Sequence, residues 1–274
     1  MNRRSWLSWL GVSAAGSLAY LPAVAESQPN KHTSDSQPNK DKSLSQPNKR
    51  TWVLSIESFH VRQADQMPRL HSYLGGDFLS FFSQIHRGPK MFLEAIVAPH
   101  TPQAVFLAAF PSFDEMIETR RQLAAHPGLQ RARADLESGE VPVVEQAQSQ
   151  ILIATGDALR FDTRPAAVES SLFELRSYHA PAWRDRPPAT VDAAFRRAGI
   201  HTIVNASTAP GEHLPRFTYL IRFPSLAARQ EAWARLDTDH DWISLQRESV
   251  GLYSSEAKVA SASIYSLTSY SPLA

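Results

Sequence analysis

The chain has 274 residues, with 28 Lys and Arg against 27 Asp and Glu, 43% hydrophobic residues and no cysteine. The absence of cysteine excludes disulfides, thiolate nucleophiles, iron–sulfur clusters and cysteine-based zinc sites. A net charge of +1 argues against a strongly basic nucleic-acid-binding protein. Composition therefore allows one large folded domain or two smaller ones, and it does not identify an activity.

Residues 1–25 have the features of an export signal. Arg3 and Arg4 provide a positive start, an uncharged stretch follows, and Ala23 and Ala25 form the pattern that signal peptidase cleaves. The paired arginines and the moderate hydrophobicity suit the twin-arginine route better than the Sec route. The alternative is an uncleaved membrane anchor, because the stretch is nearly as long as the ~20 residues of a membrane span. We expect a periplasmic or secreted protein of bacterial type, with no transmembrane segment after cleavage.

Residues 26–50 predict a disordered linker. The pentapeptide SQPNK occurs three times, at 27–31, 36–40 and 45–49, with a period of nine. The segment has one Leu and no aromatic residue, so it buries too little apolar surface to offset chain entropy. It is either a tether for the cell wall or a partner, or a tolerant linker in which a repeat has slipped.

From residue 51 onward, the same pattern of sequence motifs occurs twice. Phe110-Pro111-Ser112 returns as Phe223-Pro224-Ser225 with an offset of 113, and Ile56–His60 parallels Leu175–His179 with an offset of 119. Such internal similarity indicates duplicated structural units.

The elements alternate in the same order in both units. β-branched and aromatic residues predict strands, and these lie at Thr51–His60, Met91–Ala98, Ala104–Phe110, Val144–Ala154, Leu172–His179, Thr202–Ala206, Phe217–Phe223 and Lys258–Thr268. Apolar spacings of three and four predict a helix over 67–85, which Gly75-Gly76 should bend or divide. In the second unit Pro187-Pro188 restricts the equivalent helix to about Thr190–Ala198, and Gly199 should end it.

A second helix follows in each unit. Ser112 and Ser225 stand at the N-cap, and Glu115 completes a capping box in the first unit. Both helices should break and resume, at Pro127 and at 237–241. Their inward faces are predicted to be formed by Phe113, Met116, Ile117, Arg120 and Leu123, and by Leu226, Arg229, Trp233 and Leu236.

The order β-α-β-β-α-β, repeated over 51–160 and 161–274, predicts an α+β fold of two ferredoxin-like repeats. Each sheet has one face without helices, so two sheets facing each other should close into a pseudo-dimeric α+β barrel.

The second repeat resembles the NIPSNAP family, most clearly over 171–250. The resemblance rests on Phe173–Tyr178 (FELRSY), on Phe223–Leu226 (FPSL) and on Asp239–Trp242 (DHDW). It implies a dimeric α+β barrel fold, related at a distance to small barrel monooxygenases, and no settled activity. The chain departs from the family where His240 replaces Pro and in its shortened first helix, and the first repeat has Glu57 where Arg is expected.

Strand alternation identifies candidate ligand-binding residues: Glu57, His60, Arg176, Tyr178 and His179. Glu57 and Arg176 occupy equivalent positions with opposite charge. They are expected either to approach each other across the pseudo-twofold axis or line its cavity, or to form two separate ion pairs at a sheet edge. The two His residues are either site residues or strand-end residues with ordinary hydrogen bonds.

Asp239, His240 and Asp241 form a further candidate, for a divalent cation, although Asp239 more simply caps the resumed helix. No cofactor is predicted, with haem or a divalent metal as the alternative. Nucleotide-binding glycine motifs and the nucleophile elbow are absent from the folded part.

The sequence predicts an exported protein that binds a small apolar ligand or a protein partner through its barrel, and that can self-associate. The alternative is a barrel monooxygenase or haem-handling enzyme.

Overall fold

A computed structural model of the protein describes residues 51–155, 170–179, 188–209, 216–253 and 258–272. The predicted signal and linker, residues 1–50, lie outside the described residues.

All eight predicted strands are present, with ends within two residues of the prediction. They are β1 (Thr51–Val61), β2 (Lys90–Val97), β3 (Gln103–Phe110), β4 (Val144–Thr155), β5 (Leu172–His179), β6 (His201–Thr208), β7 (Arg216–Phe223) and β8 (Lys258–Leu267). The helical elements are η2 (Ala64–Gln66), α1 (Met67–Tyr73), η3 (Leu74–Phe78), α2 (Leu79–Ile85), α3 (Phe113–Ala125), α4 (Pro127–Glu137), α6 (Pro188–Ala198), α7 (Leu226–Asp237) and α8 (His240–Tyr253). None of these helices combines the length and the apolar character needed to cross a bilayer.

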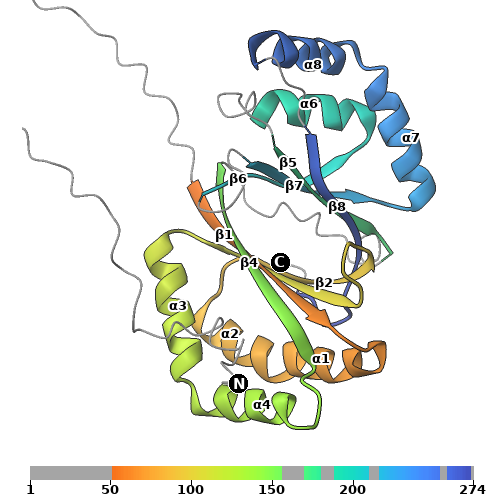
Figure 1. Ribbon diagram of the computed structural model, residues 1–274. Helices are drawn as coiled ribbons and strands as arrows, with labels where there is room; N and C mark the ends of the chain where they lie inside the picture. Colours follow the sequence, from red (N-terminus) through yellow and green to blue (C-terminus); the bar gives the residue numbers. More distant parts are fainter. Residues whose placement is uncertain (1–50, 156–169, 180–187, 210–215, 254–257, 273–274) are drawn as a thin grey trace, which may run out of the picture.

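The strands form one closed antiparallel barrel in the order β1-β3-β2-β8-β5-β7-β6-β4. The two contacts between the halves of the chain, β2 with β8 and β4 with β6, have the shortest registers of the eight strand pairs. Helices α1–α4 cover one side of the barrel and α6–α8 cover the opposite side (Figure 1). The predicted α+β barrel is confirmed at this level.

The core has three layers, because alternate residues along each strand point inward and outward. Leu54 and Ile56 of β1 belong to a buried cluster made entirely of strand residues from both halves, which fills the barrel. Phe59 points outward into a second cluster, shared with α1–α4. A third cluster, which includes Phe195 and Tyr219, lies between the barrel and α6–α8.

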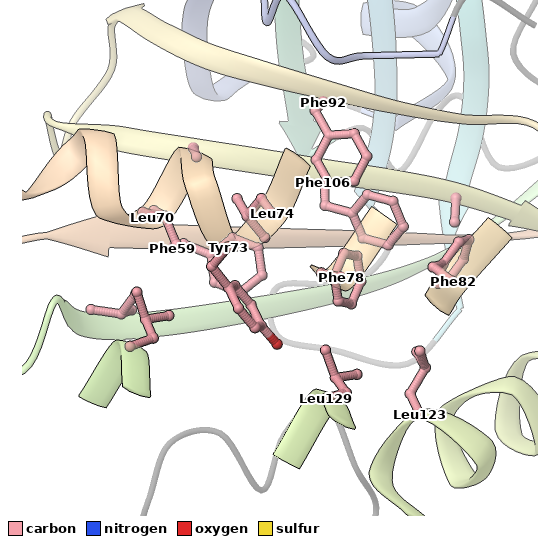
Figure 2. Close-up of a cluster of buried hydrophobic side chains, with 14 of the residues drawn as sticks. Phe59, Leu70, Tyr73, Leu74, Phe78, Phe82, Phe92, Phe106, Leu123 and Leu129 are labelled. Atoms are coloured by element: carbon pink, nitrogen blue, oxygen red, sulfur yellow. The ribbon is translucent and has the colours of Figure 1, made fainter. Parts of the chain in front are cut away.

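The outer layer of the first half is packed with phenylalanine (Figure 2). Phe78 stacks on Phe82 at 5.6 Å between ring centroids and meets Phe106 edge-to-face at 5.0 Å. Phe78 closes the π-helical turn η3, which divides the first helix at the predicted glycine pair. A Cβ on Gly75 would lie 2.6 Å from the Tyr270 ring, so the glycine allows this ring from the C-terminal segment to pack against the helix.

The predicted caps of the second helices are present. Ser112 accepts a hydrogen bond from the Glu115 N–H, and Ser225 accepts one from Ala228, each at 3.1 Å. The Glu115 carboxylate lies 3.3 Å from His86 Nδ1.

The predicted inward faces of α3 and α7 are partly wrong. Met116, Leu123 and Leu236 are buried, whereas Phe113, Ile117 and Leu226 are 41%, 46% and 58% exposed. The buried stripe of α3 runs through Met116, Thr119 and Leu123, so Phe113 and Ile117 fall on its border.

Helix α6 begins at Pro188, slightly earlier than predicted, because a proline in the first turn costs no helical hydrogen bond. It ends as predicted at Gly199, which has φ +83°. The Gly199 N–H bonds to the Arg196 carbonyl and the Ile200 N–H to the Phe195 carbonyl, which is a Schellman cap.

We predict that Phe78→Ala lowers the free energy of unfolding by about 3–5 kcal/mol, because it leaves a cavity in the aromatic layer. Phe113→Ala removes the same atoms from an exposed position and should cost less than about 1 kcal/mol. Urea unfolding of both variants measures the difference. Equal losses would contradict the assignment of Phe78 to the core.

Candidate functional site

Each half of the chain holds a buried carboxylate on the outer face of a strand, facing the helices. In the first half this is Glu57 of β1, which is 4% exposed. It forms an ion pair with Arg120 of α3 and accepts hydrogen bonds from Ser55 at 2.7 Å and Ser149 at 3.0 Å. One carboxylate therefore balances one guanidinium in this cluster.

In the second half the carboxylate is Glu174 of β5, which is 1% exposed. Arg229 of α7 donates to both of its oxygens, from Nη2 at 2.7 Å and from Nε at 2.8 Å. The Trp233 indole N–H adds a third hydrogen bond at 3.2 Å. Hydrogen bonding to Glu174 raises the pKa of Arg229 above its ordinary value.

Arg176, two residues along β5, lies beside this pair. Its guanidinium carbon is 4.4 Å from the Trp233 ring centroid and 5.3 Å from that of Tyr178. Tyr219 of β7 donates to the Tyr178 hydroxyl at 2.7 Å. Burial raises the pKa of both tyrosines above 10, so both hydroxyls are neutral at pH 7. We define the β5 cluster as the following six residues: Glu174, Arg176, Tyr178, Tyr219, Arg229 and Trp233.

Glu57 and Arg176 do not meet, so the first of the two alternatives for them is wrong. The strand face on which both residues lie is the outer face of the barrel. Each residue therefore lies under the helices of its own half. Glu57 pairs with Arg120, and Arg176 lies 3.6 Å from Glu174. Separate interactions form because a closed barrel separates the two outer layers.

His60 lies on the inner face of β1, near the end of the strand. It is 6% exposed, and its ring is 3.3 Å from the Gln103 side-chain nitrogen. Gln103 also accepts a hydrogen bond from Tyr265 of the other half at 3.1 Å, and the His100 ring meets His60 edge-on at 5.0 Å. Burial, followed by the nearby His100, lowers the pKa of His60 below its ordinary 6.5. His60 is therefore neutral at pH 7 and part of a network that joins the two halves.

His179 occupies the equivalent position on β5, where its cross-strand partner is Arg216. In the described residues the Nε of Arg216 and the hydroxyl of Thr208 are buried without a hydrogen-bond partner.

Of the five predicted ligand-binding residues, the structure brings together only Arg176 and Tyr178. Ligand binding by any of the five stays a prediction.

The Asp239–Asp241 segment is arranged around an arginine. Asp239 caps α8 through a 2.9 Å hydrogen bond from the Trp242 N–H, which confirms the capping prediction. Arg197 contacts Asp239 at 2.8 Å and Asp241 at 2.9 Å, while the His240 side chain is 95% exposed. Arg197 holds the pKa of Asp239 at about 2. Within the described residues, no three His, Asp or Glu side chains are grouped so that they could hold a metal ion.

Sequence reasoning missed Glu174, Arg229, Trp233 and Tyr219 as site residues. A signal was available, because Arg229 and Arg120 each interrupt an otherwise apolar helical stripe. An arginine in a core-facing stripe requires a buried counter-charge, and the nearest strand carries a glutamate in both halves.

Residues 168–272 match the family model of NIPSNAP, which confirms the resemblance seen in the sequence. A NIPSNAP family protein with unknown function from Agrobacterium tumefaciens strain C58 is 16% identical, with a TM-score of 0.34, over 40% of this chain and 93% of that chain. A putative monooxygenase from Lactobacillus acidophilus NCFM is 8% identical, with a TM-score of 0.46, over 80% and 93%. A heme-binding protein from Thermus thermophilus is 9% identical, with a TM-score of 0.44, over 81% and 92%. No curated protein sequence matches the chain.

We predict that Glu57→Gln and Arg120→Gln are each destabilising and strongly coupled, because either change leaves a buried charge without its partner. The double variant should lose less than the sum of the single losses by at least about 1 kcal/mol. Glu57→Gln with Arg176→Gln should be additive within about 0.5 kcal/mol. Urea unfolding of the two cycles measures both couplings, and coupling of Glu57 to Arg176 would contradict the separation of the clusters.

We also predict that His60 makes stability depend on pH. Its pKa is lower in the folded protein than in the unfolded chain, so its stabilising contribution is complete above about pH 6.5 and is lost as the pH falls below that value. His60→Gln should reduce the loss of unfolding free energy between pH 7.5 and 5.5. His240→Gln, at a side chain that is 95% exposed, should leave that loss unchanged.

Proposed function

Starting from a NIPSNAP domain in the second half of the chain, we propose that the protein is an exported binding protein rather than an enzyme. Its ligand is a small molecule with an apolar body, held at the β5 cluster between the barrel and helices α6 and α7. Export is supported by the paired arginines and the cleavage pattern of residues 1–25.

The observation that carries this proposal is the difference between the two outer layers. Strand register makes Glu57 equivalent to Arg176, since they stand opposite Phe106 and Tyr219 respectively. In the first half the side chains around Phe106 are mainly aromatic, with the Glu57–Arg120 ion pair beside them and the Lys90 ammonium 5.8 Å from the Phe82 ring centroid. In the second half the equivalent region holds two guanidinium groups, a carboxylate and two hydroxyls.

Such groups cost free energy to bury, and the equivalent positions of the first half hold one guanidinium and one carboxylate, those of Arg120 and Glu57. Buried charges next to aromatic side chains are typical of binding sites, where the polar groups orient a ligand and the aromatic surface provides the contact area. The aromatic residues that border this cluster include Phe195, Phe217 and Trp242.

We also propose that the chain arose by duplication of one ferredoxin-like unit, as the sequence repeat suggests. In support, β4-β1-β3-β2 and β8-β5-β7-β6 have the same relative order around the barrel. The first unit would then serve as the partner sheet that a dimer would otherwise supply, leaving the second unit to bind the ligand.

An oxygenase or haem-handling enzyme has less support. Such an activity needs an open cavity with convergent polar groups, whereas the interior of this barrel holds a cluster of apolar side chains whose buried members have exposures of 3% or less. His60, a candidate ligand for iron, contacts Gln103. These residues do not fit a haem group. A haem band in the absorption spectrum of the purified protein would favour the enzyme.

We predict that the protein binds 1-octanol, as an uncharged apolar probe, in a saturable manner. Trp233→Leu should weaken this binding about tenfold, because an aromatic side chain at the centre of a contact dominates its energy. Isothermal titration calorimetry measures the affinity. Trp52→Leu, in the first half, is the matched control and should bind as the unchanged protein does. Octanol binding that is absent, or equally affected by both substitutions, would contradict the proposed site.

A further inference from the structure

The β5 cluster carries one more positive charge than negative charge. Arg229 already engages both oxygens of Glu174, at 2.7 and 2.8 Å, and the Trp233 indole occupies the second oxygen as well. Arg176 Nη1 lies 3.6 Å from the nearer oxygen, which is beyond hydrogen-bonding distance. One carboxylate therefore faces two guanidinium groups.

The neighbouring hydroxyls do not supply the missing negative charge. Tyr178 and Tyr219 bond to each other at 2.7 Å, and burial raises the pKa of both. The equivalent cluster of the first half has no such excess, because Glu57 and Arg120 balance each other. Lys90 is also buried in the first half, but its ammonium donates to the backbone carbonyls of His86 and Gly88.

The Arg176 side chain is fixed by packing but is incompletely hydrogen-bonded. Its guanidinium lies against the Trp233 and Tyr178 rings, which restricts the side chain. Its Nε is buried and has no hydrogen-bond partner in the described part of the chain. The side chain as a whole is nevertheless 16% exposed.

We propose that Arg176 binds the carboxylate head group of a singly charged amphipathic ligand. This inference rests on the proposed function and adds the chemistry of the head group to it. A planar guanidinium matches a carboxylate in two parallel hydrogen bonds, and a single negative charge neutralises the surplus of the cluster. The apolar body of the ligand lies along the aromatic side chains of the same layer.

The test compares octanoate with 1-octanol, which has the same chain length without the charge, by calorimetry on the full chain at pH 7. Octanoate should bind at least about tenfold more tightly, because hydrogen bonds to charged groups are the stronger ones. Arg176→Gln should abolish the preference, so that this variant binds octanoate no more tightly than it binds octanol.

Arg121→Gln is the matched control. It removes the same charge from an α3 side chain that is 67% exposed, and it should leave the preference for octanoate intact. Arg176→Lys keeps the charge but loses the planar fork, so it should retain an intermediate preference. This variant also tests the proposal if Arg176→Gln fails to fold.

The outcomes separate the two proposals. Octanol binding without a preference for octanoate, or a preference that survives loss of the Arg176 guanidinium, would overturn the carboxylate assignment and leave the binding function standing. Failure of both probes to bind would overturn the binding function itself.

Discussion

Closure of the barrel is the constraint on which the rest of the structure depends. A four-stranded sheet covered by helices on one side leaves its other side bare, and its outer strands keep unpaired backbone groups. Here β2 pairs with β8 and β4 with β6, so that no strand of the barrel remains an edge. The bare faces of the two sheets become one filled interior, to which all eight strands contribute. Neither half can bury this surface alone.

Closure also separates the chemistry of the two outer layers. Side chains that point outward from β1 and β5 are divided by the packed interior, so each layer must satisfy its own buried charges. In both layers an acidic residue on a strand is paired with an arginine on the second helix. This pairing attaches α3 and α7 to the barrel by a directional contact, in addition to apolar packing. In the second half the arginine comes from a different helical position, which leaves space for Trp233 and Arg176.

The fold was predictable from the sequence where local signals and global packing agree. The strands, the caps at Ser112 and Ser225, the break at Gly75 and the stop at Gly199 all follow from residue types at fixed spacings. The exposure of Phe113 and Leu226 was not predictable, because apolar spacing alone does not define the width of the buried stripe. The pairing of Glu57 was also not predictable. Alternation assigns it to a face, but only the closed barrel shows which face meets the helices and which arginine lies opposite.

Strand alternation also distinguishes the second half of the chain, which the family model matches, from the first half. In the stretch from Glu174 to Tyr178 every second residue points toward the helices, and these residues are Glu174, Arg176 and Tyr178. The intervening Leu175 and Ser177 point into the barrel, where size matters more than charge. At the outward positions of the first half stand Ser55, Glu57 and Phe59, which build one neutral ion pair and an aromatic core. The first half therefore contributes its strands to the barrel without this charged pattern, because barrel closure requires only the inward residues. The outward residues of β5 are free of that requirement, so the buried charge that they carry needs another explanation, and the proposed binding of a ligand supplies one.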